Sequence, residues 1–307
     1  MERTLVYQIE KPTTVGAFLK EEAGLTRRQI SALKFREKGI LADGIRKRVS
    51  DRLEPGTELV LCLEEAEKGS HHLVGEKGEF FVLYEDPDIL AVRKPAGILV
   101  HPTGGHFSDT LSNRAAAYYR EKGEQAVIRP VGRLDKDTSG VVLFAKNQLS
   151  AARLSGEKEQ GGFSKTYLAI VKGHLPEKRG EIHAPIGPCP GERLKMQVDP
   201  VQGKEAHTSY EVLGEFEDSS LLKVWIATGR THQIRVHMAY LGHPLVGDGL
   251  YGRTSEEFER AALHAWELTC RQPFSGEGIS VKDSIPADFQ EYLRKRDYHG
   301  FDDTLLY

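Results

Sequence analysis

One short stretch of the sequence, residues 129–147, gathers several side chains that could do chemistry. In RPVGRLDKDTSGVVLFAKN the carboxylate of Asp135 lies close to the cations of Arg133 and Lys136, ahead of a loop-forming Asp-Thr-Ser-Gly run. A carboxylate held beside fixed positive charges stays ionised at neutral pH, as a nucleophile or a general base must. The pattern alone leaves alternatives open, because Asp135 and Asp137 could bind a metal ion, or Asp135 could cap a turn.

The elements around this stretch predict a mixed sheet. Apolar runs such as VVLFAK, TYLAIVKG and LLKVWIATG predict strands, whereas DTLSNRAAAYYREK, HQIRVHMAYLG and PADFQEYLRKR predict helices. Several strands follow one another with no helix between them, which favours a largely antiparallel arrangement over a doubly wound one. The expected fold class is α+β, with Asp135 in a polar loop directly before a buried strand.

The first 65 residues predict a separate, basic module. Residues 13–22 and 26–38 favour two short helices, the second with Thr26 as its N-cap, and Asp43-Gly44 is typical of a two-residue hairpin turn. Although the chain carries a net charge of −3, residues 27–52 hold nine basic and three acidic side chains, a local excess of +6. Such a patch attracts polyanions. The residues expected to contact such a polyanion are Arg27, Arg28, Lys34, Arg46 and Lys47.

The chain is therefore expected to divide into four parts. Residues 1–65 form the RNA-binding module, 66–79 a polar linker, 80–290 a catalytic domain with the mixed sheet, and 291–307 a polar tail. The three cysteines are far apart and odd in number, which favours buried thiols over disulfides or a zinc site. With no signal peptide or membrane-length apolar run in the sequence, a cytoplasmic location is expected.

Five blocks of the sequence resemble, in the same order, the motifs of bacterial RNA pseudouridine synthases of the large-subunit ribosomal RNA type. These blocks are KPAGILVHPTGGH, RLDKDTSG, KTYLAIVKG, TGRTHQIRVHMAYLGHPLVGDGLYG and LHAWEL, and the likeness extends over about residues 80–286. The leading 65 residues resemble the S-four-type RNA-binding module, a frequent companion of this domain. One departure is Gly132, where the closest subfamily has histidine, and it weakens the assignment of a particular RNA target.

The resemblance implies a role for each matching residue. Asp135 acts on the target uridine as nucleophile or base, Arg230 pairs with Asp135 and orients it, and Tyr167 stacks on the uracil. Arg133 occupies the space that the flipped nucleotide leaves, and Leu263 packs against the base. The implied reaction breaks the C1′–N1 bond, turns the uracil and rejoins it through C5, and it needs no cofactor and no metal ion.

The expected partner is RNA, with large-subunit ribosomal RNA favoured and transfer RNA second. No obligate protein partner and no membrane are implied, and a monomer is expected. Two other hypotheses remain: a non-catalytic RNA-binding factor in ribosome assembly, and a metal-dependent nuclease that uses Asp135 and Asp137. A metal site at His232 and His237 is disfavoured, because their five-residue offset does not place them on one helical face.

Overall fold

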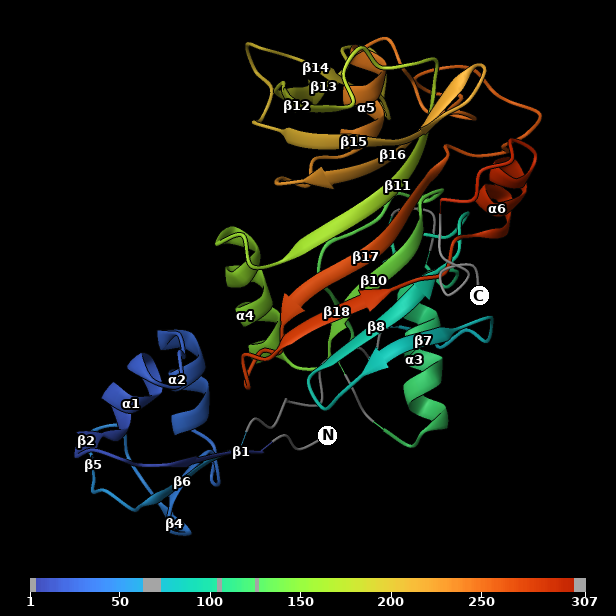
Figure 1. Cartoon of the computed structure of the whole chain (residues 1–307). Coiled ribbons are helices and arrows are strands. Elements are labelled where there is room, and N and C mark those ends of the chain that lie inside the picture. The colour runs from blue at the N-terminus through green and yellow to red at the C-terminus, as the bar shows by residue number, and fades with distance from the viewer. Residues whose placement is uncertain (1–3, 63–72, 104–106, 125–126, 301–307) are drawn as a thin grey trace.

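The computed structural model of the chain describes residues 4–62, 73–103, 107–124 and 127–300. The described part holds a small N-terminal unit and a larger unit built on a long sheet (Figure 1). No helix in these ranges is both long and apolar enough to span a membrane. Half of the linker predicted at 66–79, residues 66–72, lies outside the described residues.

The small unit is a four-stranded sheet covered by two helices. Thr26 is the N-cap of the second helix, as predicted, and its Oγ1 accepts from the Gln29 amide over 3.3 Å. Asp43 and Gly44 both have positive φ, +48° and +76°, as a type I′ hairpin requires. The sheet order is β1 (Thr4–Gln8), β6 (Glu58–Cys62), β3 (Ile40–Ala42), β4 (Ile45–Arg46); β2 (Thr13–Thr14) pairs with β5 (Arg52–Leu53), and the helices are α1 (Val15–Glu21) and α2 (Arg27–Lys34).

The large unit contains a ten-stranded, mostly antiparallel sheet, which confirms the predicted fold class. Eight strands follow the order β12-β15-β16-β11-β17-β10-β8-β7, while β18 pairs with β17 and β9 with β10. Their bounds are β7 (Phe81–Glu85), β8 (Ile89–Lys94), β9 (Arg129–Pro130), β10 (Ser139–Ala145), β11 (Ser164–Lys172), β12 (Arg179–His183), β15 (His207–Glu215), β16 (Ser219–Ile226), β17 (Leu263–Arg271) and β18 (Gly278–Lys282). A separate ribbon pairs β13 (Ile186–Pro188) with β14 (Met196–Val198).

Within the described part of this sheet, the one parallel pairing joins β10 to β17 directly after the predicted catalytic loop, with Ser139 opposite His264 and Gly140 opposite Ala265. The two backbones approach closely at that point: a Cβ atom on Gly140 would lie 2.2 Å from the carbonyl oxygen of Ala265. Gly140 also has a φ of +116°, which L side chains rarely adopt. The glycine is therefore required both by its conformation and by the contact between strands.

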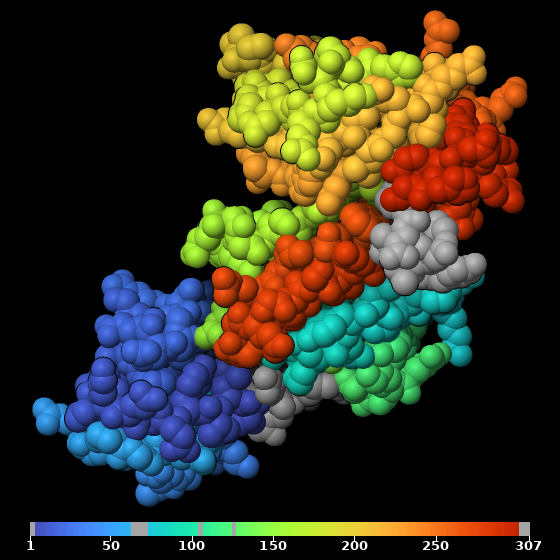
Figure 2. All heavy atoms as spheres, viewed as in Figure 1, coloured from blue at the N-terminus to red at the C-terminus, as the bar shows by residue number. Residues whose placement is uncertain are grey.

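Four helices of the large unit lie around the sheet (Figure 1): α3 (Leu111–Glu121), α4 (Gln148–Glu159), α5 (Gln233–Tyr240) and α6 (Ala287–Arg294). Helices α3, α5 and α6 match predicted helices, whereas α4 was not predicted. Helix α4 also contacts the small unit: Leu149 joins the hydrophobic cluster of that unit, and the Arg153 guanidinium donates to the Ala23 carbonyl there and to the Pro273 carbonyl of the large unit. Figure 2 shows the small unit abutting this part of the sheet.

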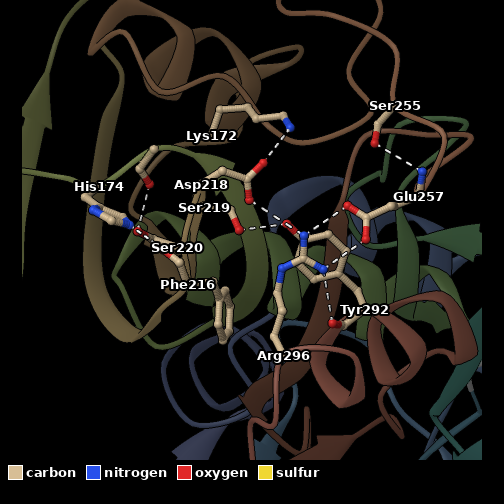
Figure 3. Close-up of polar contacts among 11 residues, drawn as sticks. Lys172, His174, Phe216, Asp218, Ser219, Ser220, Ser255, Glu257, Tyr292 and Arg296 are labelled. Carbon is tan, nitrogen blue, oxygen red and sulfur yellow. Dashed lines mark hydrogen bonds and ion pairs between the residues drawn. The ribbon is translucent and has the colours of Figure 1, made fainter.

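Helix α6 is fixed to the sheet by the polar cluster drawn in Figure 3. The Tyr292 hydroxyl donates to Ser219 Oγ over 2.7 Å, and the Arg296 guanidinium pairs with Glu257 at 3.0 Å and with Asp218 at 3.6 Å. Tyr292 and Leu293 are buried. The polar tail predicted from residue 291 is therefore corrected, since the predicted boundary falls inside a packed helix.

Candidate active site

A cavity of about 1080 Å³ opens beside the loop between β9 and β10. It continues into a smaller recess of about 70 Å³ that shares several lining residues with it. The recess is lined by side chains from four separate segments, and these include all five residues expected to act on the base: Arg133, Asp135, Tyr167, Arg230 and Leu263. The fold thus brings together residues that the sequence analysis selected one by one.

The loop that carries Asp135 is held from both sides. Leu134 is buried in the main hydrophobic cluster and anchors the loop from below. The Lys94 ammonium donates to the carbonyl oxygens of Lys136 and Thr138, both over 2.7 Å, and the Gly97 amide donates to the Lys136 carbonyl over 2.9 Å. Because its backbone is pinned on each side, the Asp135 carboxylate projects from a preorganised support.

Lys94 is a positioning residue that the sequence analysis did not identify. Its side chain, at the end of β8, is fully buried, and it also donates to the Pro95 carbonyl over 2.9 Å. Burial lowers the pKa of Lys94 to about 7, whereas the nearby Asp137 carboxylate raises it. Three carbonyl acceptors offset part of the cost of burying an ammonium group. The sequence feature that could have pointed to Lys94 is its position directly before Pro95 in the KPAGILVHPTGGH block.

Tyr167 lies in β11 where the register against β17 shifts by one residue, between Thr166 and Tyr167. A β-bulge of this kind re-aims side chains and is common beside active sites. Tyr167 is 5% exposed and still lines the recess. Burial, and next the Asp135 carboxylate, raise the pKa of Tyr167 far above its usual value. The phenol of Tyr167 is therefore neutral at physiological pH.

Arg230 precedes α5 in a loop held by Gln233. The Gln233 side-chain oxygen accepts from the Arg230 amide over 3.0 Å and from Thr228 Oγ1 over 2.8 Å. The Arg230 Nε donates to the carbonyl oxygen of Glu205 over 2.8 Å. Across the part of the chain that the structure describes, Arg230 and Asp135 form no ion pair, although both line the recess. Arg230 and Asp135 thus share one recess, but the predicted ion pair between them is not formed in this structure.

A second network missed by the sequence analysis forms the wall next to Asp135. His232 begins α5 with a φ of +55°, and its Nδ1 lies 2.9 Å from the Tyr251 hydroxyl. Arg235 binds the buried carboxylate of Asp248 through two hydrogen bonds of 2.7 Å. Desolvation lowers the pKa of His232, while Asp135 opposes that shift. The Asp135 carboxylate also raises the pKa of Arg235, so both side chains lie within electrostatic reach of Asp135.

The two histidines considered as metal ligands have different surroundings. His232 lines the cavity, whereas His237 is fully buried between Thr208 Oγ1, at 2.8 Å, and the Ala184 carbonyl, at 2.9 Å. Within the described ranges no group of three or more potential metal ligands occurs. His237 serves to join α5 to neighbouring backbone.

The basic residues of the small unit lie far along the chain from Asp135 and face solvent. Arg27, Arg28, Lys34 and Arg46 are exposed, and Lys47 is half-buried. The Arg46 guanidinium donates to the Lys34 carbonyl over 3.2 Å, so the hairpin and the end of α2 present their charges together. The role predicted for these five residues stays a prediction.

Comparison with known proteins shows which family the chain belongs to. Residues 88–240 match the family model described as RNA pseudouridylate synthase. The uncharacterized RNA pseudouridine synthase YhcT of Bacillus subtilis (strain 168) is 40% identical over 244 residues, which cover 79% of this chain and 80% of that protein. The chain belongs to the RNA pseudouridine synthase family. The synthase carries Asp135, Tyr167 and Arg230 inside the matched range.

Two further relatives agree with this placement of the synthase. The ribosomal large subunit pseudouridine synthase D of Nitrosomonas europaea is 40% identical over 223 residues, 69% of this chain and 64% of that protein. The solved structure titled Human RNA Pseudouridylate Synthase Domain Containing 1 has a TM-score of 0.57 at 30% identity, and the match covers 69% of this chain and 86% of that one. The resemblance seen in the five sequence blocks is confirmed.

Proposed function

We propose that this synthase isomerises selected uridines in large-subunit ribosomal RNA, with transfer RNA as the second candidate, and that Asp135 is its catalytic residue. The observation that carries the proposal is the recess in which Asp135 lies with Tyr167, Arg230, Arg133 and Leu263. The choice of RNA rests on relatives that are named ribosomal large subunit pseudouridine synthase D. The synthase acts as a monomer on RNA alone.

The reaction needs a flipped base and one well-placed carboxylate. Extruding a uridine from its stack costs a few kcal/mol, and stacking on an aromatic face returns about 1–3 kcal/mol per base. Tyr167 supplies that face and Leu263 an apolar wall, while Arg133 fills the vacated space. Asp135 then acts as nucleophile or base while C1′–N1 breaks, the uracil turns, C5 bonds to C1′, and the C5 proton leaves to solvent.

The small unit supplies sequence-independent affinity in this proposal. Its exposed cations, among them Arg27 and Arg28, bind backbone phosphates, and each contact releases counterions from the RNA. The unit is fixed to α4 through Leu149 and Arg153. An RNA anchored there is presented to the cavity at a set distance, so the unit and the recess act on one substrate.

The proposal is tested by tritium release from RNA labelled at C5 of uridine, prepared from a strain that lacks this gene. The wild type is expected to release tritium, and Asp135→Asn to lose turnover by at least about 10³-fold while it still binds RNA. Asp137→Asn is the matched control, because the Asp137 side chain is exposed and its contact with Arg260 uses the backbone carbonyl.

Each outcome discriminates between the hypotheses. Turnover by Asp135→Asn at the wild-type rate would refute the assignment of the catalytic residue. Equal loss in Asp135→Asn and Asp137→Asn, with RNA cleavage that a chelator stops, would favour the nuclease hypothesis. Wild-type protein that binds RNA and releases no tritium would favour the assembly factor.

A further inference from the structure

A buried lysine beside the catalytic loop lacks a counter-ion. Lys165, two residues before Tyr167 on β11, is 7% exposed and lines the cavity. Among the residues that the structure describes, it has no hydrogen-bond acceptor and no carboxylate partner. Burial, and next the nearby Lys158 ammonium, lower the pKa of Lys165 to about 7. Burying a cation without a partner costs free energy, so the position of Lys165 calls for an explanation.

Lys94 shows how this fold satisfies a lysine that has a purely structural role. Both ammonium groups are buried next to the same loop, but Lys94 donates to three carbonyl oxygens within 2.9 Å. Lys165 has no such acceptor, and its side chain borders open space instead of backbone. The difference indicates that the acceptor of Lys165 comes from outside the chain.

A second cation and a glycine complete the site. The Cβ atom that Gly132 lacks would lie 3.7 Å from the Lys158 Nζ and 3.9 Å from the Lys165 Nζ, so both ammonium groups face this one backbone position. The Cβ atom that Gly229 lacks would lie 3.5 Å from the same Lys158 Nζ. The ammonium groups of Lys158 and Lys165 therefore lie next to Gly132, three residues before Asp135, and that of Lys158 also lies next to Gly229. A side chain at either glycine would occupy the space in front of them.

We propose that Lys158, Lys165 and the gap at Gly132 form a binding site for one phosphodiester of the RNA, the one next to the target uridine. The proposal rests on the proposed function, because it assumes that RNA enters this cavity. Lys165 and Tyr167 are two residues apart on a strand, roughly 7 Å along its axis. A base stacked on Tyr167 and a phosphate held by Lys165 therefore belong to the same or to adjacent nucleotides.

Phosphate is the acceptor that fits this arrangement best. Two ammonium groups with no carboxylate between them present a net charge of about +2 once an anion restores protonation of Lys165. Lysines bind phosphate as point charges, without the planar geometry that a carboxylate draws from arginine. Binding one phosphate here would fix the ribose of the target nucleotide over Asp135. The site thus positions the sugar whose C1′ reacts, while Tyr167 positions the base.

The test uses the full chain and a labelled ribosomal RNA transcript, whose affinity is measured over a series of salt concentrations. Lys158→Met and Lys165→Met are each expected to weaken binding by roughly tenfold. The plot of log K against log salt becomes shallower by about 0.7, the value for one phosphate of a single strand. Lys165→Arg is expected to restore most of the slope. Lys172→Met, at the other end of β11, is the matched control and keeps the wild-type slope.

A second pair of variants separates charge from folding. Gly132→Asp and Gly132→Asn have side chains of nearly equal size, and both residues tolerate the positive φ of +81° better than other L residues. The aspartate supplies an internal counter-ion to both lysines, so it is expected to weaken RNA binding and to flatten the salt slope more than asparagine. Equal slopes in these two variants, or wild-type slopes in both methionine variants, would overturn the phosphate site.

The phosphate site and the isomerase proposal can be refuted separately. Tritium release by the wild type together with an unchanged salt slope in Lys158→Met and Lys165→Met refutes the phosphate site and leaves the enzyme assignment intact. A wild type that binds RNA without releasing tritium refutes the assigned reaction. In that case a shallower slope in the two variants still shows that RNA phosphate occupies the cavity.

Discussion

Replacing Gly140 by alanine tests whether the pairing of β10 with β17 sets the position of Asp135. The new Cβ would lie 2.2 Å from the Ala265 carbonyl oxygen, and a tolerable contact begins near 3.0 Å, so the two strands must separate by roughly 1 Å. The φ of +116° adds strain of about 1–3 kcal/mol for any residue with a side chain. Both effects act five residues after Asp135, the proposed catalytic residue, at the point where its loop enters the sheet.

A displacement of about 1 Å can reduce a rate by about 10²-fold, equivalent to about 2.7 kcal/mol of transition-state stabilisation. We therefore expect Gly140→Ala to lose about 100-fold in the single-turnover rate of tritium release at saturating RNA. Unfolding in urea should show a loss of at least about 2 kcal/mol, since strain and separation of the strands add. RNA affinity should change little, because the basic surface of the small unit is untouched.

Gly276→Ala is the matched control for this prediction. Gly276 has a comparable positive φ, +72°, but no atom lies within 4 Å of the Cβ it would acquire. It should lose only the backbone strain, about 1–2 kcal/mol, and keep the wild-type rate. A Gly140→Ala variant that matches Gly276→Ala in both rate and stability would refute the argument that close approach of the strands positions Asp135.

Two further predictions concern charge. Glu85 accepts from Lys146 over 2.8 Å, from the Tyr118 hydroxyl over 2.7 Å and from Lys122 over 3.0 Å; burial raises its pKa, but these bonds outweigh burial and lower it to about 2. Because the folded-state pKa lies below the ordinary 4.5, the stabilisation is complete above that pH and is lost as pH falls toward 2. Glu85→Gln should thus cost on the order of 2 kcal/mol at pH 7 and little near pH 2, measured by urea unfolding. Separately, replacing Arg27 and Arg28 by serine should weaken RNA binding most at low salt and flatten its salt dependence, whereas an unchanged slope would exclude this surface as the RNA anchor.

The sequence was sufficient to predict the elements that carry a single clear pattern. Strand β10 and the second half of β11 are continuous apolar runs, and the hairpin at Asp43-Gly44 has the turn residues that its positive φ angles demand. The five residues of the recess were found by resemblance to family motifs, because spacing alone does not show that Asp135 and Leu263 meet. The contact of Arg230 with the Glu205 carbonyl could not be predicted, since a backbone acceptor leaves no trace in residue types.

Helix α4 was missed for a physical reason. Its apolar side chains serve two partners: Leu149 packs in the cluster of the small unit, and Leu154 in the cluster under β10. They therefore form no single apolar stripe, which is the pattern that predicts an amphipathic helix. Ser155 and Gly156 lower helix propensity further. The readable signal was Asn147, whose side chain caps the helix by accepting from the Ser150 amide over 2.8 Å.

The same helix has a consequence for which uridines are chosen. Its first turns are embedded in the small unit through Leu149 and Arg153, and its last turn places Lys158 at the cavity. Lys158 follows Leu149 by nine positions in the helix, about 14 Å along its axis. If the small unit and Lys158 both bind RNA as proposed, α4 fixes the distance between the two binding points. A uridine is then selected by its distance from the RNA segment bound to the small unit, whatever the intervening bases. Changing the length of α4 by whole turns would then shift the modified position without altering the chemistry.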